Sequence, residues 1–428
     1  MEAVSAVQCW RRILAAPCAR LALGLLLAGS ACSLPGVSGA GAATRLGPGS
    51  APDLGPLVFT SEDGANELVI EGLVQVTATR LPDARRPDGL GRLKRLRPEF
   101  SGRIADVIRF HLEPKLKTDD FYYEEAWLGT DVFDGDGVLM LGRMKAPFNL
   151  EEVRSRTHID FPRFSIVNQL APVEDHGVFL NGTSPSGRWE YGLAAYNGTG
   201  DSDTTSSRDV AARLMVHPFA DDEGSAWRNL QVGVAATHGR QDRAVGGNSI
   251  ENEIGLGVVS FAPGVRLDGE RWRAGLEGAW FDGPWFVQTE YVVMQQEMSL
   301  AGTGTDVSLK GGYVTLSRVL TGESKSFKGV VPDDPFDPRT GAGTGAWVAA
   351  LRLSSLSIDD DLMTAGLAAP GAFTDHIRNV SLGLNWIPNT HTIVRSSVVH
   401  SMYDRPVAVG AGTDDRETAL MVELQLHF

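Results

Sequence analysis

The sequence predicts an all-β protein, a transmembrane β-barrel of sixteen antiparallel strands. Three observations favour this fold class: an apolar leader, sixteen short segments of strand length, and a last segment that ends on Phe428. In residues 418–428, alternate side chains are largely apolar on one side and mostly polar on the other. A strand between lipid and water needs this pattern, although a strand of a soluble β-sandwich can share it. The rest of the chain must therefore distinguish the two.

The start of the chain predicts export. Three arginines precede an apolar run over 21–28 that is too short to span a bilayer, and small residues follow it. We therefore expect a signal peptide over 1–42, a periplasmic N-terminal segment over 43–66 and a barrel over 67–428. A lipid anchor at Cys32 is an alternative, but residues 29–31 lack the bulky aliphatic side chain expected before such a cysteine.

Composition narrows the class further. The leader and its border contain all three cysteines, so cleavage after residue 42 would leave a mature chain without a disulfide or a thiolate metal site. Beyond the leader, the chain lacks an uninterrupted apolar run of about 18 residues, which excludes a helical membrane protein. The 49 glycines and the short alternating runs indicate an all-β chain. The formal charge of −14 argues against nucleic acid as a partner.

The predicted strands follow one another along the chain in sixteen segments, an even number, as a single-chain bacterial barrel requires. They are 67–79, 94–104, 106–116, 121–131, 137–146, 175–183, 187–197, 208–217, 229–239, 271–281, 284–296, 306–319, 345–357, 376–387, 391–403 and 416–428.

The connections between these segments alternate in length. Those after odd-numbered strands include 81–93, 146–174, 241–270, 359–374 and 404–415, whereas those after even-numbered strands are mostly tight turns. Long loops on one rim and short turns on the other are typical of outer-membrane barrels with periplasmic termini. The exception is 320–344, a Pro- and Asp-rich stretch at a place where a short turn is expected. Its aspartates could bind calcium, but next to proline they are more typical of turn formers.

Alternation within each segment predicts which side chains point into the barrel. In 271–281, Ala274 and Leu276 lie on one face, and Arg273 and Glu277 lie on the other. An arginine or lysine on the lipid face costs about 2 to 4 kcal/mol at the bilayer midplane, so the charged face must line the interior.

Several motifs resemble the phosphate-selective porin O and P family, and the resemblance covers nearly all of the mature chain. The segments that carry it are 137–151, 174–178, 191–198, 320–323, 382–386 and 425–428. The resemblance implies a sixteen-stranded outer-membrane porin, a homotrimer surrounded by outer-membrane lipid, with the third loop folded inward as a constriction. It also implies small anions such as phosphate as the transported solutes.

The candidate pore-lining residues are cations on the expected interior face and in the third loop, because guanidinium groups in a narrow wet bore concentrate anions. They are Arg95, Arg97, Arg103, Arg109, Arg154, Arg156, Arg163, Arg213, Arg273, Lys310 and Arg352. Inward acids, among them Glu71, Glu99 and Glu113, could pair with these arginines. Any single arginine could therefore be an ordinary salt bridge of the wall.

The third loop departs from the family pattern. Where phosphate-binding members of the family carry lysines, this chain has Glu152 and Thr157, although Arg154 and Arg156 could supply the missing charge. We favour a passive channel with a preference for anions, and a general unselective or cation-tolerant porin is the alternative. An outer-membrane barrel enzyme is a further alternative, but the chain contains neither G-x-S-x-G nor H-E-x-x-H. We expect no enzymatic activity, cofactor or metal.

Overall fold

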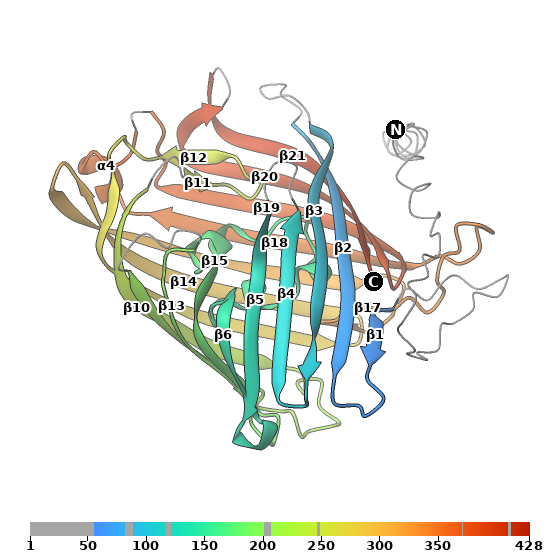
Figure 1. Cartoon of the computed structure of the whole chain (residues 1–428). Helices are drawn as coiled ribbons and strands as arrows, with labels where there is room; N and C mark the ends of the chain where they lie inside the picture. The colour runs from blue at the N-terminus through green and yellow to red at the C-terminus, as the bar shows by residue number, and fades with distance from the viewer. Residues whose placement is uncertain are drawn as a thin grey trace, which may run out of the picture. The chain divides into compact units, whose positions relative to one another are not determined.

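The computed structural model describes residues 55–81, 89–116, 121–200, 207–245, 249–369, 371–409 and 412–428. Sixteen strands in this part of the chain form one closed antiparallel sheet (Figure 1). Each strand pairs with the next along the chain, and the last strand pairs with the first, where His427 lies opposite Leu73. The predicted barrel is therefore confirmed. The predicted signal peptide, 1–42, lies outside the described residues.

The strands of the ring overlap the sixteen predicted segments one for one. They are β2 (Glu67–Arg80), β3 (Gly89–Ile104), β4 (Ile108–Leu116), β5 (Phe121–Val132), β6 (Gly137–Lys145), β7 (Glu174–Thr183), β8 (Trp189–Tyr196), β9 (Arg208–Val216), β10 (Gln231–Ala244), β13 (Arg266–Asp282), β14 (Trp285–Leu300), β15 (Thr303–Val319), β18 (Ala346–Ile358), β19 (His376–Asn389), β20 (Thr392–Val409) and β21 (Gly412–His427).

Several strands extend beyond the alternation from which they were predicted. β20 and β21 stay paired as far as Val409 and Gly412, so most of the connection predicted over 404–415 is strand. In the same way, β10 and β13 stay paired as far as Ala244 and Arg266. Beyond the bilayer both faces of a hairpin meet water, so the apolar alternation that lipid imposes disappears while backbone pairing continues. These two connections are therefore shorter than predicted.

A short strand, β1 (Leu57–Thr60), lies in the segment that was expected to precede the barrel. It pairs with the start of β2, and Leu57 lies opposite Ile70. β21 leaves this part of β2 free, because its pairing with β2 stops at the backbone bonds between Phe428 and Gly72. β1 therefore continues the line of β21 along the edge of β2, a pairing that depends on where another strand ends.

Over much of the wall, the strands have an exposed apolar face and a buried polar face. On β13, Leu276 is exposed, whereas Arg273 and Glu277 are buried, and on β10 Val232 is exposed and Thr237 is buried. In a closed membrane barrel the apolar face meets lipid and the polar face lines the interior. The buried faces of the strands therefore form the interior wall.

The remaining elements lie in the connections. They are 3-10 turns η1 (Phe133–Gly135), η2 (Arg156–His158) and η3 (Ile166–Leu170), helices α3 (Leu150–Val153) and α4 (Asp361–Thr364), and hairpin strands β11 (Ser249–Glu251), β12 (Gly257–Ser260), β16 (Lys325–Ser326) and β17 (Gly329–Val330). In the described part of the chain, no helix combines the length and the apolar content that crossing a bilayer would require.

The connection 320–344, where the sequence pattern leads one to expect a short turn, contains the β16–β17 hairpin. Lys325 forms an ion pair with Asp160, which belongs to the connection between β6 and β7. The carboxylates of Asp334 and Asp337 accept backbone N–H bonds from Thr344 (3.0 Å) and Arg339 (2.8 Å). These bonds fit the turn-forming role of the aspartates, and the ion pair attaches this connection to the one between β6 and β7.

Candidate functional site

The third loop, residues 146–173 between β6 and β7, begins with a helix anchored to the wall. The carboxylate of Glu290 on β14 accepts the backbone N–H groups of Leu150 (2.7 Å) and Glu151 (2.8 Å) at the start of α3. The side chain of Asn149 accepts a third N–H bond, from Glu152 (2.9 Å). The start of a helix carries free N–H donors, so a carboxylate at this position stabilises it. Glu290 therefore holds the first turn of the loop on β14.

The middle of the third loop runs past four neighbouring wall strands, and its backbone carbonyls accept bonds from their buried side chains. These bonds run from Arg352 on β18 to Arg163 (3.1 and 3.2 Å) and Phe164 (3.3 Å), from Asn385 on β19 to Asp160 (2.8 Å), from Arg395 on β20 to Ile159 (2.7 Å), and from Gln425 on β21 to Thr157 (3.0 Å). Because carbonyls without partners are costly when buried, these bonds specify the path of the loop along β18–β21.

Apolar packing holds the same loop from the other side. Ile166, Val167 and Leu170 of η3 belong to one buried cluster with Val292 and Leu309 of the wall. The cluster also includes residues of two other connections, 245–265 and 359–375. We call the connection 245–265, between β10 and β13, the fifth loop. The third and fifth loops and the connection 359–375 therefore pack together on the buried face of the strands from β13 to β20.

A cavity of about 360 Å³ lies between the other face of the third loop and the wall from β2 to β6. We call this cavity the passage. Its cationic side chains are Arg97, Lys145 and Arg156. Its other titratable side chains are Glu71, Glu99, Glu113, Glu125, His111, His158 and His427. The passage therefore has a mixed lining in which both signs of charge meet.

Most of the predicted cations form ion pairs with carboxylates. The pairs are Arg97 with Glu113 and with Glu124 (2.6 Å), Arg109 with Asp131 (2.7 Å), Arg156 with Glu152 and with Glu174 (3.4 Å), Arg163 with Glu251 (2.8 Å), Arg213 with Glu277 (2.6 Å), Arg273 with Asp209 (3.6 Å), and Arg352 with Glu253 (2.8 Å) and Glu151 (3.4 Å). Pairing cancels much of each charge, so the wall is not a continuous row of free guanidinium groups.

Three predicted arginines have different surroundings. Arg95 donates to the neutral amide of Gln75 (2.7 Å). Arg154 bonds to Gln288, and its guanidinium lies 4.2 Å from the ring centre of Phe327. Arg103 is exposed near the end of β3. Of the three, Arg95 places a positive charge on the interior wall in a bond with a neutral partner.

The predicted inward position of Lys310 is wrong. Lys310 is exposed and lies on the same face of β15 as Val314 and Leu316, whereas Leu309 and Tyr313 lie on the buried face. Apolar residues occupy the interior here because they pack under the third and fifth loops. The rule that apolar side chains face lipid therefore fails where a loop covers the wall.

Among the described residues, Lys94 and Arg271 are two of the interior cations that were missed. At Lys94 the register between β2 and β3 shifts, since Gln75 pairs with Arg95 and Val76 with Leu93. This bulge leaves Lys94 as an extra residue, and its Nζ reaches Glu423 (2.8 Å) as well as the carbonyl of Pro162 in the third loop. Strict alternation cannot place both Lys94 and Arg95 inside. Arg271 is the second, paired with Asp209 (2.6 Å) at the start of a predicted segment.

Burial and neighbouring charges determine the protonation of the third loop. Burial, together with repulsion from His427 and Arg395, lowers the pKa of His158 to about 3, so this imidazole is neutral at pH 7. Burial alone would raise the pKa of Glu152, but Arg156, Lys145 and a bond from Asn168 outweigh it and lower the pKa. Glu152 and Arg156 are therefore both charged, and the loop does not carry a net positive charge at this point.

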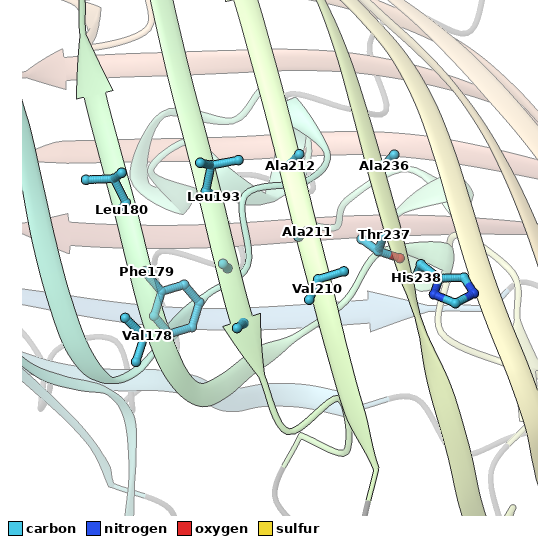
Figure 2. Close-up of a pocket in the computed structure, with 12 residues that line it drawn as sticks. Val178, Phe179, Leu180, Leu193, Val210, Ala211, Ala212, Ala236, Thr237 and His238 are labelled. Atoms are coloured by element: carbon cyan, nitrogen blue, oxygen red, sulfur yellow. The ribbon is translucent and has the colours of Figure 1, made fainter.

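A larger hollow, of about 590 Å³, lies over β7 to β10 (Figure 2). Its exposed lining side chains include Val178, Leu193 and Val210, which belong to the apolar face of the wall. The other labelled side chains in Figure 2 are those of Phe179, Leu180, Ala211, Ala212, Ala236, Thr237 and His238. This hollow lacks the charged lining that an ion path requires, so the passage is the candidate site.

Comparison with known proteins shows the family to which this chain is related. The model of a family described as phosphate-selective porin O and P matches residues 82–428. Porin O of Pseudomonas aeruginosa is 25% identical over 339 residues, which cover 73% of this chain and 75% of that protein. An anion-selective porin from Comamonas acidovorans has a similar structure, with 12% identity, a TM-score of 0.55 and coverage of 85% of this chain and 100% of the other. The outer-membrane channel DcaP of Acinetobacter baumannii has 10% identity, a TM-score of 0.53 and coverage of 86% and 99%.

Proposed function

Since this chain belongs to the phosphate-selective porin O and P family, we propose that it forms a passive outer-membrane channel for small hydrophilic solutes, with a preference for anions such as phosphate. The observation that carries this proposal is the passage, which lies inside a closed barrel between the third loop and the wall from β2 to β6. A solute crossing by this route would move down its gradient without covalent chemistry.

The inward fold of the third loop is part of this proposal. It is supported by the bonds from its carbonyls to buried side chains of β18–β21 and by the docking of α3 on Glu290. A loop held inside the barrel narrows the bore, and the narrowest point dominates selectivity. Arg156 and Lys145 line the passage, and Arg95 is close enough to interact electrostatically with Arg156.

The family also supports a proposal for localisation and assembly. We propose that residues 1–42 direct export, that the barrel sits in outer-membrane lipid, and that three copies assemble into a homotrimer. The exposed apolar face of the wall fits both lipid and a neighbouring barrel. Sedimentation of the purified protein in detergent would give the number of chains, and a mass of one chain would remove the trimer from the proposal.

The second candidate is an unselective or cation-tolerant pore. The carboxylates of Glu71, Glu99, Glu113 and Glu125 line the same passage as the cations, and this observation favours it. The first candidate predicts that anions pass better than cations. The second predicts no selectivity or a preference for cations, so the ratio of anion to cation permeability separates the two.

Zero-current potentials across a planar bilayer under a salt gradient give this ratio. We expect the wild type to pass anions better than cations. Replacing both Arg95 and Arg156 by Gln removes two charges near the narrow point, and a change of roughly 1 kcal/mol in the barriers would lower the ratio about fivefold. Arg103→Gln, at an exposed position near the end of β3, is the matched control and should leave the ratio unchanged.

Three outcomes would contradict the proposal at different levels. A wild type that passes cations better than anions would remove the anion preference but keep the channel. An unchanged ratio in the double variant would mean that Arg95 and Arg156 do not act on passing ions. The absence of any conductance from correctly folded protein would remove the channel itself.

A further inference from the structure

The fifth loop crosses the interior from β10 and β13 to strands at the end of the chain. Asn252, just after β11, donates to Tyr403 on β20 (2.7 Å) and to Glu417 on β21 (3.1 Å). Ile254 packs in a buried cluster with Val399 and Met421 of the same two strands. Bonds from Ile254 N (3.1 Å) and Leu256 N (3.0 Å) to the Asn252 side chain fix the turn between these contacts. The tip of the fifth loop is therefore attached to β20 and β21, the last two strands of the wall.

Glu253, between these two contacts, joins the wall to the third loop. Its carboxylate accepts bonds from Arg352 on β18 (2.8 and 3.2 Å), from Ser381 on β19 (2.9 Å) and from Ser354 on β18. It also accepts the backbone N–H of Ile166 (3.1 Å), at the start of η3 in the third loop. Glu253 is 2% exposed, so each of these bonds replaces water that the carboxylate has lost.

Arg352 extends the same network further into the third loop. Besides Glu253, its guanidinium binds the carbonyls of Arg163 and Phe164 and the carboxylate of Glu151 (3.4 Å). Glu151 in turn accepts the N–H (2.9 Å) and hydroxyl (2.7 Å) of Ser165. Without Glu253, the buried charge of Arg352 would depend on Glu151, which belongs to the loop that Arg352 holds. Glu253 is thus the member of this network that the fifth loop contributes.

We propose that Glu253 is a positioning residue: from the fifth loop, it locks the third loop against β18 and β19 and thereby sets the width of the passage on the loop's other face. This inference rests on the proposed channel function. The third loop forms one wall of the passage and β2–β6 form the other, so any freedom of the loop changes the bore directly. An extracellular loop then controls the width of the passage without touching the solute.

Single-channel recording of Glu253→Gln tests this role. The amide keeps the size of the side chain but loses its charge, and its NH₂ group cannot accept the bonds from Arg352. We expect the wild type to hold a single steady open level, and we expect the variant to show transitions between levels, with an altered ion ratio. Heat-dependent migration on SDS gels would show that the variant barrel is folded.

The matched control is Asp209→Asn. Asp209 is also a buried carboxylate, and its side-chain partners among the described residues include Arg271, Arg273 and Gln241 on the wall. It should keep a steady level. The same transitions in Asp209→Asn would mean that loss of any buried carboxylate disturbs the channel, and that would overturn the inference for Glu253.

Two additional variants sharpen the test, and the first of them also decides it if Glu253→Gln does not fold. Ser381→Ala removes one donor to Glu253 and should produce the same transitions less often. The Gln169 side-chain amide bonds to the backbone O (2.9 Å) and N (3.0 Å) of Glu251, so cysteines at these two positions, joined through a short bis-thiosulfonate reagent, would form a disulfide link between the third loop and the fifth. In the Glu253→Gln background this disulfide should restore a steady level, which a reducing agent should abolish.

The failures are distinguishable. A folded wild type that does not conduct would defeat the proposed channel. A conducting wild type with an equally steady Glu253→Gln would defeat only the role of Glu253, as would a disulfide that leaves the transitions unchanged.

Discussion

The strands from β13 to β21 and those from β2 to β9 both turn arginines and glutamates toward the interior, but loops pack on the first set. β13 and β15 have 17 residues each, whereas β8 has 8, so the two sides also differ in height. We call the strands from β13 to β21 the tall side and those from β2 to β9 the short side. On the tall side, Arg352 and Arg395 are buried and bind carbonyls of the third loop. On the short side Arg97 and Lys145 line the passage.

This difference shows that inward direction alone does not make a cation part of a pore. Arg352 and Arg97 lie on equivalent faces of their strands, and both pair with two carboxylates. What separates them is the presence of a loop between the side chain and the open space. The same chemical group therefore stabilises a loop on one side and lines the passage on the other.

The largest expected effect concerns Arg352. Arg352→Met should lower the free energy of unfolding by about 3 to 5 kcal/mol, because it leaves the buried carboxylates of Glu253 and Glu151 without their cation. The matched variant on the short side is Arg109→Met, whose pair with Asp131 is 40% and 31% exposed, and it should cost about 0 to 1 kcal/mol. Urea unfolding from lipid vesicles, followed by tryptophan fluorescence, measures both. Equal losses would mean that the two sides are equally covered.

An intermediate effect concerns pH. The pKa of His158 is about 3 in the folded chain against an ordinary value of 6.5, so between these values the unfolded state binds a proton that the folded state does not. Stability therefore falls as pH falls through this window, by roughly 2 to 3 kcal/mol between pH 7 and pH 4. In His158→Gln this contribution should vanish. Urea unfolding of both proteins at pH 7 and pH 4 gives the difference, and a variant as acid-sensitive as the wild type would place His158 in water.

The smallest expected effect concerns Lys310. Because this side chain lies on the exposed face of β15, Lys310→Ala should change the free energy of unfolding by less than about 0.5 kcal/mol. Conductance and ion ratio should stay at their wild-type values, because the side chain does not face the interior. A changed ion ratio in a planar bilayer would mean that Lys310 lines the pore and that the assignment of faces on the tall side is wrong.

The sequence by itself determined the number of strands, their order and most of their faces. Lipid outside and water inside impose alternation on each strand, and this signal is local, so Leu276 and Arg273 reveal their faces within one segment. The same signal missed β1, because that strand depends on where β21 ends. It also missed the bulge at Lys94, because one extra residue in β3 changes the face without changing the composition.

Only the tertiary structure decided what each interior charge does. The partners of Glu253 lie 87 residues away at Ile166, 99 at Arg352 and 128 at Ser381, and no spacing in the sequence connects them. Lys310 was placed wrongly for a related reason. The interior face of β15 is apolar because it packs against loops that are distant from β15 in the sequence. Alternation reports the solvent on either side of a strand, whereas the fate of a charge depends on which distant segment covers it.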